Sequence, residues 1–96
     1  MSQLTLVSPD ERPIKPLVES ALLERAKRLE AAIRQTEIRL TAFEKRYGLN
    51  TGEFLTRFAQ NQYQHSDDYD DWIGESRMLD RLREKLNRLE SITIVD

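Results

Sequence analysis

The sequence lacks several features that would point to particular classes of protein. It has no cysteine, which excludes disulfides and thiolate metal sites. Its three glycines are isolated, so no glycine-rich phosphate loop is present. No apolar run reaches the roughly 18 residues of a membrane span, and the N-terminus lacks a charged-then-apolar secretion signal. We therefore expect a cytoplasmic protein without contact to a membrane.

The residues needed for catalysis are equally scarce. His65 is the only histidine, and no serine or cysteine nucleophile is recognisable beside it. The acids between Asp67 and Asp71 offer hard oxygen ligands of the kind that Ca²⁺ or Mg²⁺ prefers. They lack the alternating spacing and central glycine of a calcium loop, however, and a helix N-terminus favours acids in any case. We predict a protein that is not an enzyme and that binds no metal or cofactor.

A heptad pattern dominates the 96 residues, of which 33% are charged. From Leu22 to Tyr47, residues spaced alternately by four and three form an apolar seam interrupted only by Thr36, as in a coiled coil. The pattern returns from about Asp70 to Glu90, with Glu75 breaking it near the start. The residues predicted to line the seam of a hairpin or dimer are Leu22, Leu29, Ile33, Leu40, Phe43, Tyr47, Leu79, Leu82, Leu86 and Leu89.

Local signals divide the chain between these helices. Gly48 stands where a helix C-cap glycine belongs, and Asn50 or Thr51 can cap a short helix that ends by about Tyr63. Ser66 then precedes the acids of the second long helix. Seven aromatic residues cluster around this connection, which indicates either a small core that closes the hairpin or a docking knob for a partner.

These patterns predict an all-α fold, namely an antiparallel helical hairpin with a short connecting helix. We assign an extended arm to residues 1–16, the hairpin domain to 17–90 and a tail to 91–96. Two-helix units of this size are marginal alone, and Ala31, Ile38 and Ala42 form a second apolar stripe on the first helix. We therefore expect a homodimer that forms a helical bundle.

The charge is uneven, which bears on the choice of partner. Residues 1–47 carry +2, residues 48–75 carry −5 and residues 76–96 carry +1. The first helix is rich in arginine and lysine, but glutamates alternate with them, unlike the concentrated positive charge of a nucleic-acid reader. We expect a basic protein partner and no nucleic acid, with a nucleic-acid-associated or structural coiled-coil factor as the alternative.

One stretch resembles a known group of proteins. Glu44-Lys45-Arg46-Tyr47-Gly48, then Glu53-Phe54 and Phe58, then Asp67-Asp68 and Asp71-Trp72 before a leucine-rich helix, resemble small prokaryotic helical-hairpin proteins that form the antitoxin half of toxin–antitoxin modules. The resemblance covers about residues 17–90, and Asp71 stands where a glutamate is commoner. It implies a protein that neutralises its partner by direct contact, with a toxin as the candidate partner.

The partner surface is predicted from the two termini and from residues 67–71, which we call the acidic turn. Leu4-Thr5-Leu6-Val7 and Ile92-Thr93-Ile94-Val95 are apolar and strand-capable, so they either order on a partner, pair with each other or pack on the hairpin. The candidate partner-binding residues are Glu53, Asp67, Asp68, Tyr69, Asp71, Trp72, Leu4, Leu6, Ile92 and Ile94.

Overall fold

Three helices and a pair of short strands make up the computed structural model, which describes residues 2–8 and 12–95. Their order is β1 (Ser2–Thr5), α1 (Lys15–Tyr47), α2 (Thr51–Ala59), α3 (Asp67–Glu90) and β2 (Ile92–Val95). The predicted predominance of helix is confirmed, whereas the prediction of a purely α-helical chain has to be extended by the strand pair. The molecule is elongated, with extents of 62 × 21 × 17 Å.

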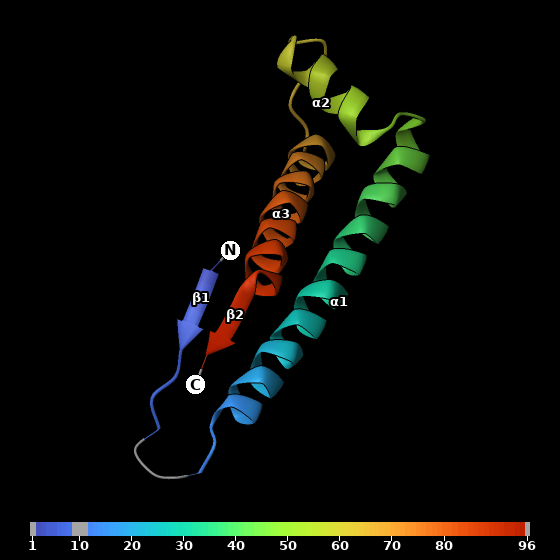
Figure 1. Ribbon diagram of the computed structural model, residues 1–96. Coiled ribbons are helices and arrows are strands. Elements are labelled where there is room, and N and C mark those ends of the chain that lie inside the picture. The colour runs from blue at the N-terminus through green and yellow to red at the C-terminus, as the bar shows by residue number, and fades with distance from the viewer. Residues whose placement is uncertain (1, 9–11, 96) are drawn as a thin grey trace.

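The long helices α1 and α3 lie side by side and run in opposite directions (Figure 1). The short helix α2 crosses the end at which α1 stops and α3 starts, and the two strands lie at the other end. No helix among the described residues is both long enough and apolar enough to cross a membrane.

The helix ends follow the local signals in the sequence. Gly48 adopts φ +63°, a left-handed conformation that glycine tolerates best, and its N–H donates to the Glu44 carbonyl. The Asn50 side chain accepts from the Glu53 N–H at 2.7 Å, so Asn50 rather than Thr51 caps α2. Ser66 likewise accepts from the Tyr69 N–H at 3.1 Å and caps α3.

The predicted start of the first long helix was a few residues off. Helix α1 begins at Lys15 and not near Leu17, because Pro16 sits in the first turn, where its missing N–H would have no partner in any case. Helix α3 begins at Asp67, directly after its Ser66 cap, and therefore starts before the point near Asp70 at which the heptad pattern returns. The acidic run is therefore the first turn of α3.

The predicted seam lies at the contact between α1 and α3. Leu29, Leu40 and Leu79 are buried, and Tyr47 is the most exposed of the predicted seam residues. The other predicted seam residues are half-buried: Leu22, Ile33, Phe43, Leu82, Leu86 and Leu89. Thr36, the polar interruption, is fully buried, and its hydroxyl donates to the Ala32 carbonyl at 2.9 Å. A hydroxyl satisfied within its own helix is compatible with a buried seam.

The two termini pair with each other. Strands β1 and β2 form a parallel two-stranded sheet in which Ser2 lies beside Ile92 and Leu4 beside Ile94. Of the outcomes left open by the sequence, mutual pairing is the one observed. The tail and part of the arm therefore form one element, although they are the two ends of the chain.

We expect that replacing Leu40 with alanine destabilises the protein by about 2–5 kcal/mol, because its side chain is 7% exposed and its removal leaves a cavity in the core. Leu17→Ala is the matched control, since Leu17 is 71% exposed and its loss should change the free energy of unfolding by no more than about 0.5 kcal/mol. Urea unfolding followed by circular dichroism measures both. Equal effects of the two substitutions would contradict the assignment of this core.

Candidate partner-binding site

The acidic turn rests on a core of stacked aromatic rings. Trp72 is fully buried, and its indole stacks on Phe54 with ring centroids 3.9 Å apart and planes within 4°. Phe43 and Tyr47 of α1 stack on the same indole at 5.6 and 5.7 Å. Tyr69 lies 5.3 Å from the Tyr47 ring and 5.4 Å from the Phe54 ring. Between the two interpretations of the aromatic cluster, the structure supports the small core.

A chain of hydrogen bonds joins the three helices beside these rings. The Trp72 Nε1–H donates to the Thr51 hydroxyl at 3.0 Å, and that hydroxyl donates to Glu44 Oε2 at 3.0 Å. The Thr51 backbone N–H donates to the same Glu44 oxygen at 2.7 Å. Glu44 lies in the last turn of α1, Thr51 is the first residue of α2 and Trp72 lies in α3. One short hydrogen-bond network therefore connects all three helices where the chain turns. Sequence analysis missed this role of Glu44 and Thr51, although the position of Thr51 at a helix start was a signal.

The Asp68 carboxylate forms hydrogen bonds within the molecule. Its Oδ2 accepts hydrogen bonds from the Arg46 guanidinium at 2.8 Å and from the Tyr47 hydroxyl. The hydrogen bond from Tyr47, followed by the one from Arg46, lowers the pKa of Asp68. The same contact with the carboxylate raises the pKa of Tyr47. Asp68 therefore fastens the start of α3 to the end of α1, which reduces its availability to a partner.

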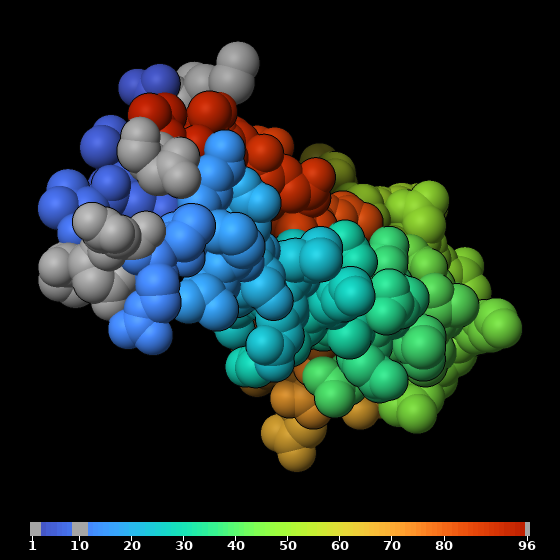
Figure 2. Space-filling view, turned by 60° about the horizontal axis from the view of Figure 1, so that its bottom comes forward, coloured from blue at the N-terminus to red at the C-terminus, as the bar shows by residue number. Residues whose placement is uncertain are grey.

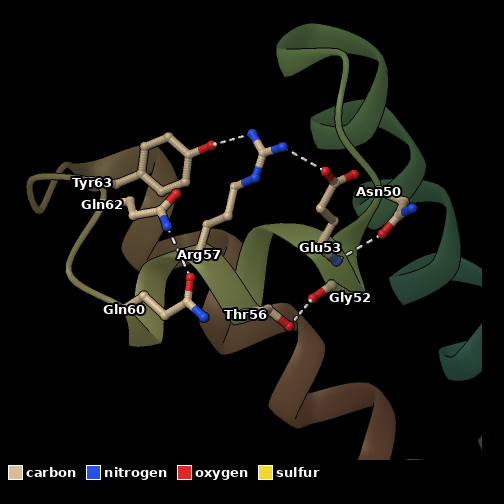
Figure 3. A network of polar contacts seen from close by, with 8 residues as sticks. All are labelled: Asn50, Gly52, Glu53, Thr56, Arg57, Gln60, Gln62 and Tyr63. Carbon is tan, nitrogen blue, oxygen red and sulfur yellow. Dashed lines mark hydrogen bonds and ion pairs between the residues drawn. The ribbon is translucent and has the colours of Figure 1, made fainter.

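Glu53 is also engaged within its own helix. Its carboxylate accepts from Arg57 at 2.6 Å, and Arg57 also donates to the Tyr63 hydroxyl at 3.4 Å (Figure 3). This network ties the residues after α2 back onto that helix. Glu53 remains on the surface but carries a neutralising cation beside it.

The remaining acids of the turn are exposed. Asp67 and Asp71 have no ion pair among the residues that the structure describes, and Asp70 contacts His65 Nδ1 at 3.1 Å. Within the described part of the chain, no group of three or more histidine, cysteine, aspartate or glutamate side chains is placed to hold a metal ion. The exposed carboxylates of Asp67 and Asp71 thus form a negative surface.

A groove of about 700 Å³ runs beside this surface, between α1 and α3. Ala42, Phe43 and Met78 contribute apolar walls, and Asp71 and Glu75 contribute acidic ones. The other lining residues are Arg39, Arg46, Asp68, Asp70, Gly74 and Arg81. The sequence did not predict this groove, because it depends on how the two helices face each other.

Glu75 is an unusual member of the groove. One of its oxygens, Oε1, contacts Arg39 at 3.4 Å, whereas Oε2 is buried and has no hydrogen-bond partner within the described structure. A buried carboxylate oxygen without a donor costs free energy. Glu75, which interrupts the heptad pattern, therefore places a hydrogen-bond acceptor without a donor between the helices.

The predicted partner-binding residues thus separate into four groups. Glu53 and Asp68 are paired with arginines of the same chain. Asp67 and Asp71 are exposed, while Tyr69 is half-buried. Trp72 must be corrected, because a side chain with no exposed surface cannot contact a partner directly. Leu4, Leu6, Ile92 and Ile94 lie in or beside the strand pair, far from the acidic turn (Figure 1). The prediction had treated the turn and the termini as parts of one binding mode.

Comparisons with protein-family models, with curated proteins and with solved structures find no match for this chain. The resemblance to antitoxins therefore stays a prediction that depends on the quoted motifs alone.

We expect Thr51→Val to destabilise the protein by about 1–3 kcal/mol, because it leaves the buried Trp72 N–H without an acceptor while keeping the side-chain shape. Thr56→Val is the control, since its exposed hydroxyl donates to Gly52 within the same helix (Figure 3) and should contribute less than about 0.5 kcal/mol. Trp72 is the only tryptophan, so its fluorescence reports on this site directly during urea unfolding. Similar losses in both variants would argue against the network.

The lowered pKa of Asp68 predicts a dependence of stability on pH. In the folded protein the pKa of Asp68 lies below its ordinary value of 3.8. The stabilisation that Asp68 provides is therefore fully present above that ordinary value and is lost as the pH falls through the lower pKa of the folded protein. In urea unfolding between about pH 6 and pH 2, wild type should exceed Asp68→Asn in stability near neutrality, and the difference should shrink in acid. Asp67→Asn is the control, since it removes a charge from the same turn at a residue that has no ion pair within the described part of the chain. A difference that stays constant with pH would contradict the assignment.

Proposed function

We propose that this protein is a protein–protein interaction module, an antitoxin-like regulator that binds and neutralises a basic partner protein. The observation that carries the proposal is the arrangement at one end of the molecule. There Asp67 and Asp71 are exposed, form no ion pair with any residue that the structure describes, and lie beside the stacked aromatic core. Charges held in place attract a basic protein over a distance and fix its orientation on contact.

The groove beside these carboxylates supplies a place for side chains of the partner. Its walls combine Phe43 and Met78 with four acids and three arginines, and two of those arginines are already paired with acids of the groove. Arginine and lysine side chains have apolar stems and cationic ends, so they match such a surface in both respects.

The basic residues of α1 give less support to the alternative of nucleic-acid binding. Arg28 is paired with Glu24 at 2.6 Å, Arg39 with Glu75 at 3.4 Å and Arg46 with Asp68 at 2.8 Å. These pairs partly neutralise the positive charge that phosphate groups would need.

We further propose that the chain associates with itself. The stripe of Ala31, Ile38 and Ala42 on α1 is exposed, and Ile38 has 63% of its surface accessible. Apolar side chains in such a stripe favour burial against another helix. This stripe is one candidate surface for a homodimer.

The partner is most directly sought in the product of a small reading frame adjacent to this gene. We expect that product to be basic, to inhibit growth when expressed alone and to be neutralised when this protein is expressed with it. An adjacent product that is harmless and does not bind the purified protein would remove the support for an antitoxin-like role.

With that product as the probe, Asp67→Asn/Asp71→Asn should weaken the affinity about 3- to 10-fold in calorimetry, because two exposed attractive charges are lost. Glu30→Gln/Glu90→Gln is the control, since it removes the same charge from exposed positions outside the acidic turn. The loss should diminish as the salt concentration rises. Equal affinities of the two double variants would show that the acidic turn is not the contact.

A further inference from the structure

Strand β1 is the least covered element of the fold. Gln3, Leu4 and Thr5 are all exposed, and Leu4 has 40% of its surface accessible. Strand β2 lies between β1 and α1, and none of the described residues lies along the outer edge of β1 (Figure 1). In Figure 2 the dark blue residues of β1 lie at the periphery of the molecule, at the end opposite to α2. Parallel strands are normally buried within larger sheets, so this two-stranded sheet is incomplete as a single chain.

The outward-facing backbone groups can be assigned from the pairing. Leu6 N–H donates to the Val95 carbonyl at 2.7 Å, so the amide of Leu6 points toward β2. Because backbone groups alternate in direction along a strand, the N–H and C=O groups of Gln3 and Thr5 point away from β2, toward the free edge. These are the groups that a further strand would bind.

The free edge lacks two of the usual protections against pairing. Residues 2–8 contain no charged residue and no proline, both of which keep edge strands of other proteins from pairing. An uncharged edge also offers nothing to select a basic partner, which the acidic turn at the other end would attract. An identical β1 is itself uncharged, so it matches this edge without any charge complementarity.

We infer that the free edge of β1 pairs in antiparallel fashion with β1 of a second copy of this chain and so joins two sheets into one of four strands. A two-fold axis through Thr5 would place Leu4 of one copy opposite Leu6 of the other. Leu4 and Leu6 share the sheet face of Ile94, so the apolar face continues across the axis. Such an interface uses the same edge on both copies, so that no free β1 edge is left for a third copy.

This inference rests on the proposed self-association and names its surface. The test compares wild type, Thr5→Pro, Thr5→Ser and Ile38→Asp by sedimentation equilibrium over a range of concentrations. Thr5→Pro removes an outward N–H and leaves the ladder with β2 intact, because proline is tolerated on an edge strand whose N–H faces solvent. Thr5→Ser retains that N–H and is the matched control.

We expect wild type to sediment as a dimer of the 11.3 kDa chain, and Thr5→Ser and Ile38→Asp to do the same. Thr5→Pro should raise the dimer dissociation constant at least about 10-fold. Its far-ultraviolet circular dichroism and its urea midpoint at low concentration should match those of monomeric wild type, which separates loss of pairing from loss of folding.

Two results would overturn the inference in different ways. A dimer that survives Thr5→Pro but dissociates in Ile38→Asp would leave self-association intact and assign it to the α1 stripe. A wild-type chain that is monomeric at all concentrations up to the high micromolar range would remove the self-association proposal as well. Neither result would affect the test of the acidic turn, which uses a different partner and different residues.

Discussion

The packing of the Trp72 indole is the contact on which the arrangement of the three helices depends. Phe43 of α1 and Phe54 of α2 both stack on it, and its N–H donates to Thr51 at the start of α2. A buried aromatic side chain contributes a large apolar area, and its one polar atom has to be satisfied. Both conditions are met only when all three helices are in place, so this residue fixes the turn of the chain.

The rigid turn determines which carboxylates remain available. Asp68 is drawn inward by Arg46 and Tyr47, since the end of α1 approaches the first turn of α3. Asp67 and Asp71, which lie four residues apart and therefore next to each other on the surface of α3, stay in solvent. A binding surface whose charges are already positioned loses little conformational entropy on association. The internal role of Asp68 therefore supports the proposed role of its neighbours.

The sequence predicted those features that depend on short-range signals. The heptad spacing predicted two long helices and most of their contact residues, and Gly48, Asn50 and Ser66 predicted where helices end and begin. Each of these signals acts through a residue and its neighbours within one or two turns.

The sequence did not predict features that depend on contacts between residues far apart in the chain. Whether an aspartate is exposed or bonded to α1 depends on the rotation of two helices, and Asp67, Asp68 and Asp71 look alike in the sequence. The burial of Trp72 depends on α2 crossing the end of the helix pair. The pairing of Leu4 with Ile94 joins residues from the two ends of the chain, and alternating apolar residues indicate a strand without naming its partner. For the same reason the groove at Glu75 could not be predicted from the heptad break.

The two proposed surfaces lie at opposite ends of an elongated molecule. Helix α1 has 33 residues and spans about 50 Å, and it separates the strand pair from the acidic turn. A dimer joined at β1 would therefore leave both acidic turns uncovered and well apart. Each dimer could then hold two copies of a basic partner without steric conflict. Alternatively, it could bind a dimeric partner at two points. The first contact would then raise the effective concentration for the second. Self-association through the strands and partner binding through the turn are thus compatible functions of one chain, because they use no common residue.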